Sequence, residues 1–213
     1  MFQEIKKEWQ TAFAEKKFKR TFWFSLLFLA VLLQILSRFL IFNETRSGVL
    51  FSDPYMKYFE PVDLTWLIFG LIYVGLVAGI ILLMKYPKNL LLAIQTYALL
   101  AVFRMIAMYS LPLEPPLNTI PLVDPLIQFF GSGDVLTKDL FFSGHTSTMT
   151  LLFLTAATKK VKAVFFAGIF VVGAAVLFQQ VHYSIDVIAA PFFAYGSYSL
   201  AKFIDARVLG LRE

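Results

Sequence analysis

The two histidines are the side chains of this 213-residue sequence best suited to exchange protons near neutral pH. Each lies in a short polar cluster within an apolar stretch, and the clusters read Ser143-Gly144-His145-Thr146 and His182-Tyr183-Ser184-Ile185-Asp186. If a helix begins near Tyr183, the carboxylate four residues after His182 lies on or near the same helical face. It can accept the proton of one imidazole nitrogen and leave the other as a nucleophile toward phosphorus. We therefore predict catalytic roles for His145, His182 and Asp186.

The first cluster has the form of a helix start. Ser143 suits the N-cap, Gly144 permits close approach of another group, and the first backbone amides are free to bind phosphate. His145 can then protonate a departing oxygen and later take a proton from an incoming hydroxyl. Structural interpretations stay open for both clusters: an ordinary capped helix at Ser143, and an Asp186 that only caps its helix while His182 anchors at the membrane interface.

Arg104 is a cation within a run that is otherwise apolar from Ala98 to Met108. One interpretation is a guanidinium that binds phosphate and stabilises charge in the transition state. The other is a side chain that extends to the headgroup region, about 9 Å away by helical rise. Arg38, near the end of the first apolar segment, is interpreted in this second way.

The composition indicates a protein embedded in a lipid bilayer. Apolar residues make up 59% of the chain and charged residues 15%, and the mean hydropathy is +0.72. The absence of cysteine excludes disulfides and thiolate chemistry. Two histidines are too few for a typical histidine-rich zinc site, and we expect no metal or other cofactor. The net charge of +5 is scattered along membrane flanks, so we expect no nucleic acid partner.

Six apolar segments must position these side chains. They predict an all-α polytopic membrane bundle with six transmembrane helices as one domain over 21–213, the spans covering 21–42, 62–84, 89–110, 141–158, 161–181 and 184–204. Residues 1–20 carry six lysines and arginines, and their apolar side chains recur at helical spacing. This pattern predicts an amphipathic helix on the membrane surface, with a partly disordered basic tail as the alternative. A further surface or re-entrant helix is expected around Pro121 to Phe130.

The distribution of basic residues predicts the orientation. Most lie at the N-terminus, in the turns near Lys85 and Lys160, and at the C-terminus, whereas the opposite loops hold only Arg46, Lys57 and Lys138. The positive-inside rule then places both termini in the cytoplasm. Both histidines fall at the extracytoplasmic ends of their spans.

The motifs resemble the sphingomyelin synthase branch of the type 2 phosphatidic acid phosphatase superfamily. Ser-Gly-His-Thr at the start of the fourth span, Asp139 at the family's spacing before it, and His-Tyr-Ser-Ile-Asp-Val entering the sixth span carry the resemblance. The stretch from Arg104 to Leu111-Pro112 is also similar to that branch. Three places depart from family patterns: Thr137-Lys138 replaces Cys-Gly, Pro191-Phe192 lies where tyrosine is common, and Val176 replaces an arginine of the phosphatase branch.

The resemblance implies an enzyme that moves a phosphoryl-headgroup from a phospholipid donor to a lipid hydroxyl or to water. His182 becomes the nucleophile that forms a phosphohistidine, Asp186 its activator, and His145 the acid and base. We expect the remaining site residues to bind substrate: Arg104, Lys138, Asp139, Ser143, Gly144 and Tyr183. With only Arg104 and Lys138 as nearby cations, a singly charged phosphodiester donor is favoured over a phosphomonoester.

Other functions remain open from the sequence. A lipid phosphate phosphatase of the same superfamily differs only in its acceptor. A proton-coupled lipid transporter or flippase could use the histidine and aspartate as a relay, although such proteins usually break a helix near the membrane midplane. A catalytically inactive lipid-binding scaffold is a third possibility. The sequence does not predict the oligomeric state.

Overall fold

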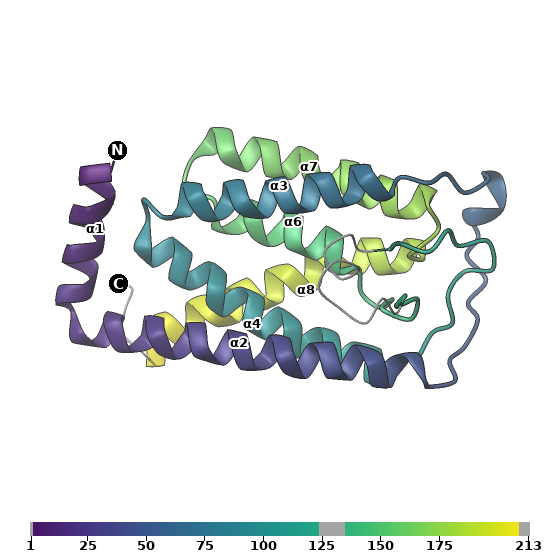
Figure 1. Cartoon of the computed structure of the whole chain (residues 1–213), viewed down its shortest axis with the longest axis horizontal. Helices are drawn as coiled ribbons and strands as arrows, with labels where there is room; N and C mark the ends of the chain where they lie inside the picture. Colours follow the sequence, from purple (N-terminus) through teal and green to yellow (C-terminus); the bar gives the residue numbers. More distant parts are fainter. Residues whose placement is uncertain (1, 124–134, 209–213) are drawn as a thin grey trace.

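The computed structural model describes residues 2–123 and 135–208, and all named elements in these two segments are helical, as predicted. All α-helices except the N-terminal one run along one long bundle, and the N-terminal helix lies across one end of it (Figure 1). Short single-turn elements lie at Met56–Tyr58 (η1) and Ile204–Val208 (η2). Their bounds are α1 (Phe2–Ala14), α2 (Lys16–Glu44), α3 (Thr65–Leu83), α4 (Pro87–Ser110), α6 (Gly144–Thr155), α7 (Lys159–Phe178) and α8 (Ser184–Phe203). The helix predicted around Pro121 to Phe130 falls mainly outside the described residues.

Five helices of the described segments are long and apolar enough to cross a membrane: α2, α3, α4, α7 and α8 with its extension to Arg207. They indicate an integral membrane protein. The predicted count of six spans is not confirmed, because the apolar segment 141–158 forms only the 12-residue helix α6. A helix of that length extends about 18 Å, which is less than the roughly 30 Å hydrocarbon core.

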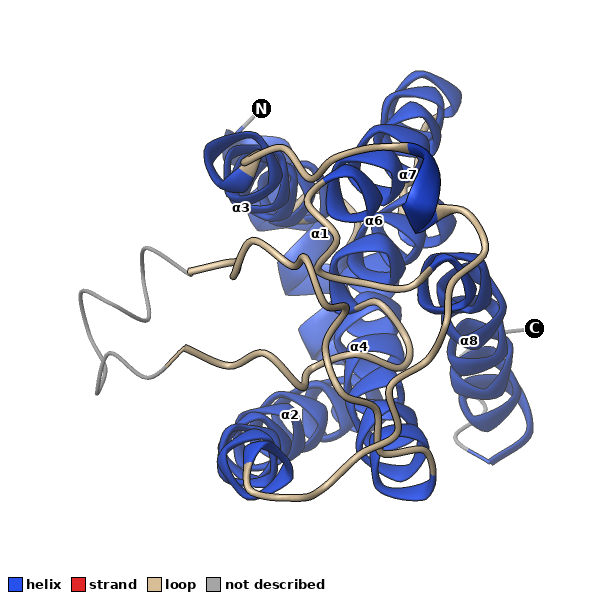
Figure 2. Ribbon diagram, turned by 90° about the vertical axis from the view of Figure 1, so that its right-hand side faces the viewer, coloured by secondary structure: helices blue, strands red, loops and turns tan. Residues whose placement is uncertain are grey.

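Helix α6 is short because its ends are set by local chemistry. Ser143 is its N-cap, and Ala156 leaves the helix with an extended ψ of 136°. Its neighbours α3, α4, α7 and α8 enclose it, as the end-on view of Figure 2 shows. Most α6 residues from Thr146 to Thr155 are therefore buried in protein. The helix that begins with the Ser-Gly-His-Thr cluster thus lies at the centre of the bundle.

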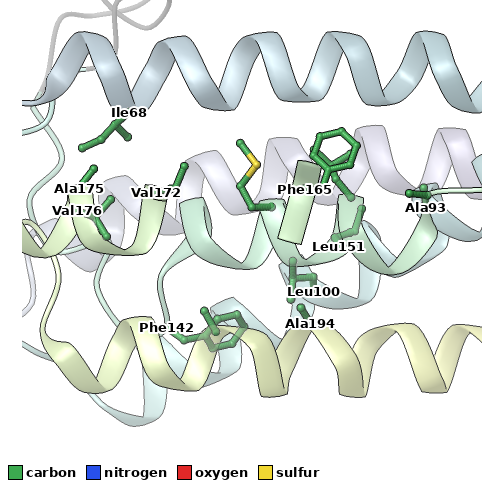
Figure 3. Packing of buried hydrophobic residues seen from close by; sticks show 14 of the residues in the cluster. Ile68, Ala93, Leu100, Phe142, Leu151, Phe165, Val172, Ala175, Val176 and Ala194 are labelled. Carbon is green, nitrogen blue, oxygen red and sulfur yellow. The ribbon is translucent and has the colours of Figure 1, made fainter. Parts of the chain in front are cut away.

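The apolar core lies among α3, α4, α6, α7 and α8. Figure 3 shows Ile68 of α3 pointing toward Val172 and Ala175 of α7, all three of them buried. Near the histidine clusters, the rings of Phe142 and Phe193 stack with centroids 4.1 Å apart. Close packing of this kind holds the ends of α6 and α8 in a defined relation.

The N-terminal helix α1 packs against the bundle through its aromatic residues. Trp9 and Phe13 contact Phe18 and Phe22 of α2, and Trp9 Nε1 donates a hydrogen bond of 2.8 Å to the Met84 carbonyl. Trp9 and Phe13 are therefore half-buried against the bundle, whereas Phe2 remains 84% exposed. A position of this helix on the membrane surface is not confirmed by the fold. Figure 1 shows α1 and the end of α8 at the same end of the bundle.

Candidate active site

The structure brings the two histidines together at the end of the bundle opposite α1. His145 lies in the first turn of α6 and His182 directly precedes α8, and their ring centroids are 6.0 Å apart with an interplanar angle of 64°. Both rings line one cavity of about 180 Å³, which Phe69 of α3 and Asp139 also line. His182 is only 2% exposed. This cavity, called here the histidine cavity, is large enough for a small polar group.

Asp186 lies against one side of the His182 ring. Its Oδ2 atom lies 3.5 Å from His182 Nδ1 and accepts a 3.0 Å hydrogen bond from the Tyr183 backbone N–H. Both side chains of the pair are almost fully buried. A buried carboxylate stabilises a neighbouring imidazolium and orients the ring. Nε2 is then the ring nitrogen of His182 that is not committed to Asp186.

A backbone hydrogen bond joins the two histidine clusters. The Ser143 N–H donates to the Asp186 carbonyl over 3.1 Å, so the start of α6 is tied to the first turn of α8. Ser143 is fully buried and its hydroxyl accepts from the Thr146 N–H at the N-cap of α6. The sequence-predicted cap is present. Ser143 therefore has a positioning contact in addition to any contact with substrate.

Arg104 turns into the protein rather than toward the headgroup region. Its guanidinium donates a hydrogen bond of 3.1 Å to the Phe142 carbonyl and forms an ion pair with the Asp139 carboxylate. The residue is 6% exposed. Gly144 makes room for it, because a Cβ atom there would lie 1.9 Å from Arg104 Nη1. The guanidinium thus stabilises the segment from Asp139 to Phe142, which directly precedes α6.

Replacing Gly144 with alanine is expected to lower turnover at least tenfold and to destabilise the protein by about 1–3 kcal/mol, the usual cost of overpacking. The new methyl group must displace Arg104 from Phe142 and Asp139, next to His145. Turnover and thermal unfolding of purified protein measure the effect. Gly70→Ala is the matched control, since nothing lies within 4 Å of a Cβ at that position. Equal behaviour of the two variants would contradict the prediction.

A second cavity of about 260 Å³ adjoins His145 on the other side. It lies among α2, α3, α4 and α6, and it shares Phe69, Asp139 and His145 with the histidine cavity. Arg104 and Gly144 line this second cavity, together with apolar side chains such as Leu36, Ile72, Leu76 and Leu100. His145 therefore faces two spaces, one beside His182 and the other largely apolar.

Lys138 and Tyr183 line neither of these two cavities. Lys138 Nζ donates a hydrogen bond of 2.9 Å to the Glu114 carboxylate and one of 2.7 Å to the Arg46 carbonyl. Tyr183 is 1% exposed, and its hydroxyl donates to the Glu114 carbonyl over 2.9 Å. In this arrangement both side chains connect the loops around the site, and the substrate contacts expected of them stay predictions.

The pairing with Lys138 makes the loops sensitive to acid. Hydrogen bonds from the Lys138 ammonium and the Gly48 N–H lower the pKa of Glu114 below its ordinary value. Because the pKa of Glu114 is lower in the folded protein than in the unfolded chain, ionised Glu114 stabilises the fold at pH values above the unfolded pKa of about 4.3. This stabilisation is lost as the pH falls through the lower pKa of the folded protein. Glu114→Gln should therefore lower the melting temperature at pH 7, and the difference from wild type should shrink below about pH 4. Unfolding scans across this range, with the exposed Glu60→Gln as control, test this; a constant difference at all pH values would contradict it.

Several residues that position the site were missed by sequence reasoning. The Asp53 carboxylate accepts a hydrogen bond of 2.6 Å from the Ser184 N–H and one of 3.1 Å from the Ser184 hydroxyl. These bonds anchor the start of α8. Glu44 accepts hydrogen bonds from Thr137 and Lys138, which precede Asp139. These partners are 131 and 93 residues apart in the sequence, so spacing could not indicate them.

Two buried glutamines stabilise the turn between α7 and α8 that contains His182. Gln179 accepts from the Leu64 N–H and donates to Thr65, each over about 3 Å, and Gln180 donates 3.1 Å to the Phe59 carbonyl. Both amides are almost fully buried. A Gln-Gln pair at the end of an apolar segment was a usable signal, since buried amides require partners.

Among the residues that the structure describes, no group of three or more histidine, aspartate or glutamate side chains has a metal-binding arrangement. Of the described carboxylates near the histidines, Asp186 accepts a hydrogen bond from Tyr183 through Oδ2, and Asp139 pairs with Arg104. We assign no residue as a metal or cofactor ligand.

Residues 138–202 match the family model described as PAP2 superfamily C-terminal. The match supports the type 2 phosphatidic acid phosphatase superfamily. It covers α6, α7 and nearly all of α8, and therefore His145, His182 and Asp186. Comparison with curated proteins and with solved structures gives no match. This match supports a lipid phosphatase or phosphotransferase type of function, without distinguishing the sphingomyelin synthase-like branch.

Proposed function

We propose that the protein is a membrane lipid phosphotransferase similar to the sphingomyelin synthases, moving a phosphoryl-headgroup from a phospholipid to a lipid hydroxyl or to water. One observation carries the proposal: two imidazoles with centroids 6.0 Å apart line one cavity, and a buried carboxylate lies against one of them. Both rings therefore border one space in which a phosphoryl group can contact them. The superfamily match supports the same class of chemistry.

In the first half of the reaction, Nε2 of His182 attacks the phosphorus atom and the bond from phosphorus to the lipid oxygen breaks. His145 gives its proton to the departing lipid oxygen, and Asp186 stabilises the positive charge on His182. In the second half, the acceptor hydroxyl attacks the phosphohistidine, His145 takes its proton, and the phosphorus–nitrogen bond breaks. The first-turn amides of α6 lie beside His145 and can bind the phosphate oxygens.

The charges around the site favour a phosphodiester donor. Arg104 is paired with Asp139 and Lys138 with Glu114, so both expected cations already have carboxylate partners. A phosphomonoester brings almost two negative charges and usually needs several cations around it, whereas a phosphodiester brings one. The largely apolar second cavity next to His145 suits the lipid part of the leaving or incoming molecule.

We also propose that the histidine end faces the extracytoplasmic side. The basic residues of α1, the start of α2, and the turns before α4 and α7 gather at the other end, as the positive-inside rule requires of the cytoplasmic face. A lipid phosphate phosphatase is the second candidate, favoured by the superfamily match, and it differs only in using water as acceptor.

Purified protein in liposomes tests the proposal. Labelled phosphatidylcholine, phosphatidylethanolamine, phosphatidylglycerol and phosphatidic acid are supplied as donors, each with diacylglycerol, ceramide or no lipid acceptor. Transfer of the phosphoryl-headgroup to a lipid acceptor, or its release to water, supports the proposal, whereas release of inorganic phosphate from phosphatidic acid alone supports the phosphatase. His145→Ala should slow both halves of the cycle, whereas Lys160→Gln, at the other end of the bundle, should leave the rate unchanged. No chemical change in any donor would refute the proposal.

A further inference from the structure

A third cavity, of about 440 Å³, lies at the end of the bundle opposite the histidines. It is formed between α2 and α4 and closed by Ile204, and we call it the α2–α4 cavity. Its volume is in the range of small-molecule sites. Its walls combine aromatic and aliphatic side chains with polar ones: Arg20, Thr21, Phe24, Ser25, Phe28, Gln95, Ala98, Leu99 and Ile204.

Several polar groups of this cavity have no hydrogen-bond partner among the residues that the structure describes. The Oε1 atom of Gln95 is buried without a hydrogen bond in the described part of the chain. The hydroxyls of Thr21 and Ser25, both in largely buried residues, likewise make no hydrogen bond to described residues. A polar group buried without a partner costs about 1–3 kcal/mol, which a bound ligand with matching groups would recover.

Hydroxyls elsewhere in the helices of the bundle behave differently. Those of Thr96, Thr155 and Ser197 each donate to the carbonyl four residues earlier, over 2.7–2.8 Å. This back-bonding is the usual way to satisfy a hydroxyl inside a helix. Thr21 and Ser25, which are likewise on a long apolar helix, do not use it within the described structure. Their hydroxyls are available to a molecule in the cavity.

The cavity also has a cation at its rim. Arg20 is exposed, lines the cavity, and forms no ion pair within the described residues. Below it, the stacked rings of Phe24 and Phe28, with centroids 6.0 Å apart, give an apolar wall that opens toward lipid. A basic pocket between transmembrane helices at a membrane boundary is a typical binding site for anionic lipid headgroups.

We propose that the α2–α4 cavity binds one anionic phospholipid whose headgroup carries a hydroxyl, such as phosphatidylglycerol. Arg20 pairs with the phosphate, the Gln95 carbonyl accepts from the headgroup hydroxyl, and an acyl chain lies against Phe24 and Phe28. Thr21 and Ser25 bond to the glycerol or ester oxygens. This site is separate from the histidine cavity and does not depend on the proposed reaction.

Native mass spectrometry of the purified full chain in non-ionic detergent tests the proposal, with phosphatidylglycerol and phosphatidylcholine as probes. We expect one phosphatidylglycerol per chain to bind at least fivefold more tightly than phosphatidylcholine. Arg20→Gln should weaken phosphatidylglycerol binding about fivefold, whereas Lys19→Gln, which removes the neighbouring exposed charge outside the cavity, should change it less than twofold. Equal losses from the two variants, or equal binding of the two lipids, would overturn the proposal.

Gln95→Leu separates ligand binding from folding. The change removes a buried acceptor that has no hydrogen-bond partner in the described segments, so the lipid-free protein should unfold at the same or a higher temperature. Phosphatidylglycerol binding should nevertheless weaken severalfold. Unchanged binding would show that the headgroup does not reach Gln95 and would overturn the assignment. His182→Ala should bind phosphatidylglycerol as wild type does, which keeps this result independent of catalysis.

Discussion

Replacing His182 with alanine is expected to lower the turnover of the lipid donor by about 10³-fold or more, because the change removes the proposed nucleophile. The same variant should form no phosphorylated protein. Initial rates in liposomes and labelling from a donor with radioactive phosphorus measure the two effects. Labelled wild-type protein that is stable in base and labile in acid identifies a phosphohistidine.

The effect must be separated from loss of folding, since His182 is 2% exposed. His182→Gln keeps most of the volume and a polar group, and it should be as inactive as His182→Ala while unfolding closer to the wild-type temperature. Turnover within tenfold of wild type in either folded variant would rule out His182 as the nucleophile.

Replacing Asp186 with asparagine is expected to lower turnover by about 10²–10⁴-fold, in the range known when a carboxylate that orients a catalytic imidazole is neutralised. The amide oxygen can still accept from the Tyr183 N–H, as the carboxylate does over 3.0 Å. The start of α8 is thus retained, and only the negative charge beside His182 Nδ1 is removed. The rate of phosphoenzyme formation measures the effect.

Asp186→Ala provides the matched comparison. It removes both the charge and the acceptor for Tyr183, so it should be as inactive as Asp186→Asn and also less stable by about 1 kcal/mol, the usual effect of a lost helix cap. If Asp186→Asn keeps full activity while Asp186→Ala loses it, the carboxylate only caps α8. That result would restore the structural interpretation of the second histidine cluster.

The long apolar helices were largely predictable because hydrophobicity and length are local properties. Helix α7, at Lys159–Phe178, begins within two residues of the segment predicted for it, and α8 begins at Ser184 as predicted. The span predicted over 141–158 is longer than helix α6, which covers Gly144–Thr155. Its apolar residues Phe141 and Phe142 precede the N-cap of α6 and pack against Phe193. Hydropathy does not distinguish an apolar residue in a helix from one in an extended segment beside it.

The sequence by itself determined that this is an all-helical membrane protein with two histidine clusters, because composition, apolar run length and the spacing of His182 and Asp186 depend only on neighbouring residues. Only the tertiary structure decided which charged side chains contact one another and which polar groups they bind. Arg104 pairs with Asp139, Lys138 pairs with Glu114, and Asp53 anchors Ser184. Each of these contacts joins distant parts of the chain, so it depends on how the helices pack rather than on the local sequence.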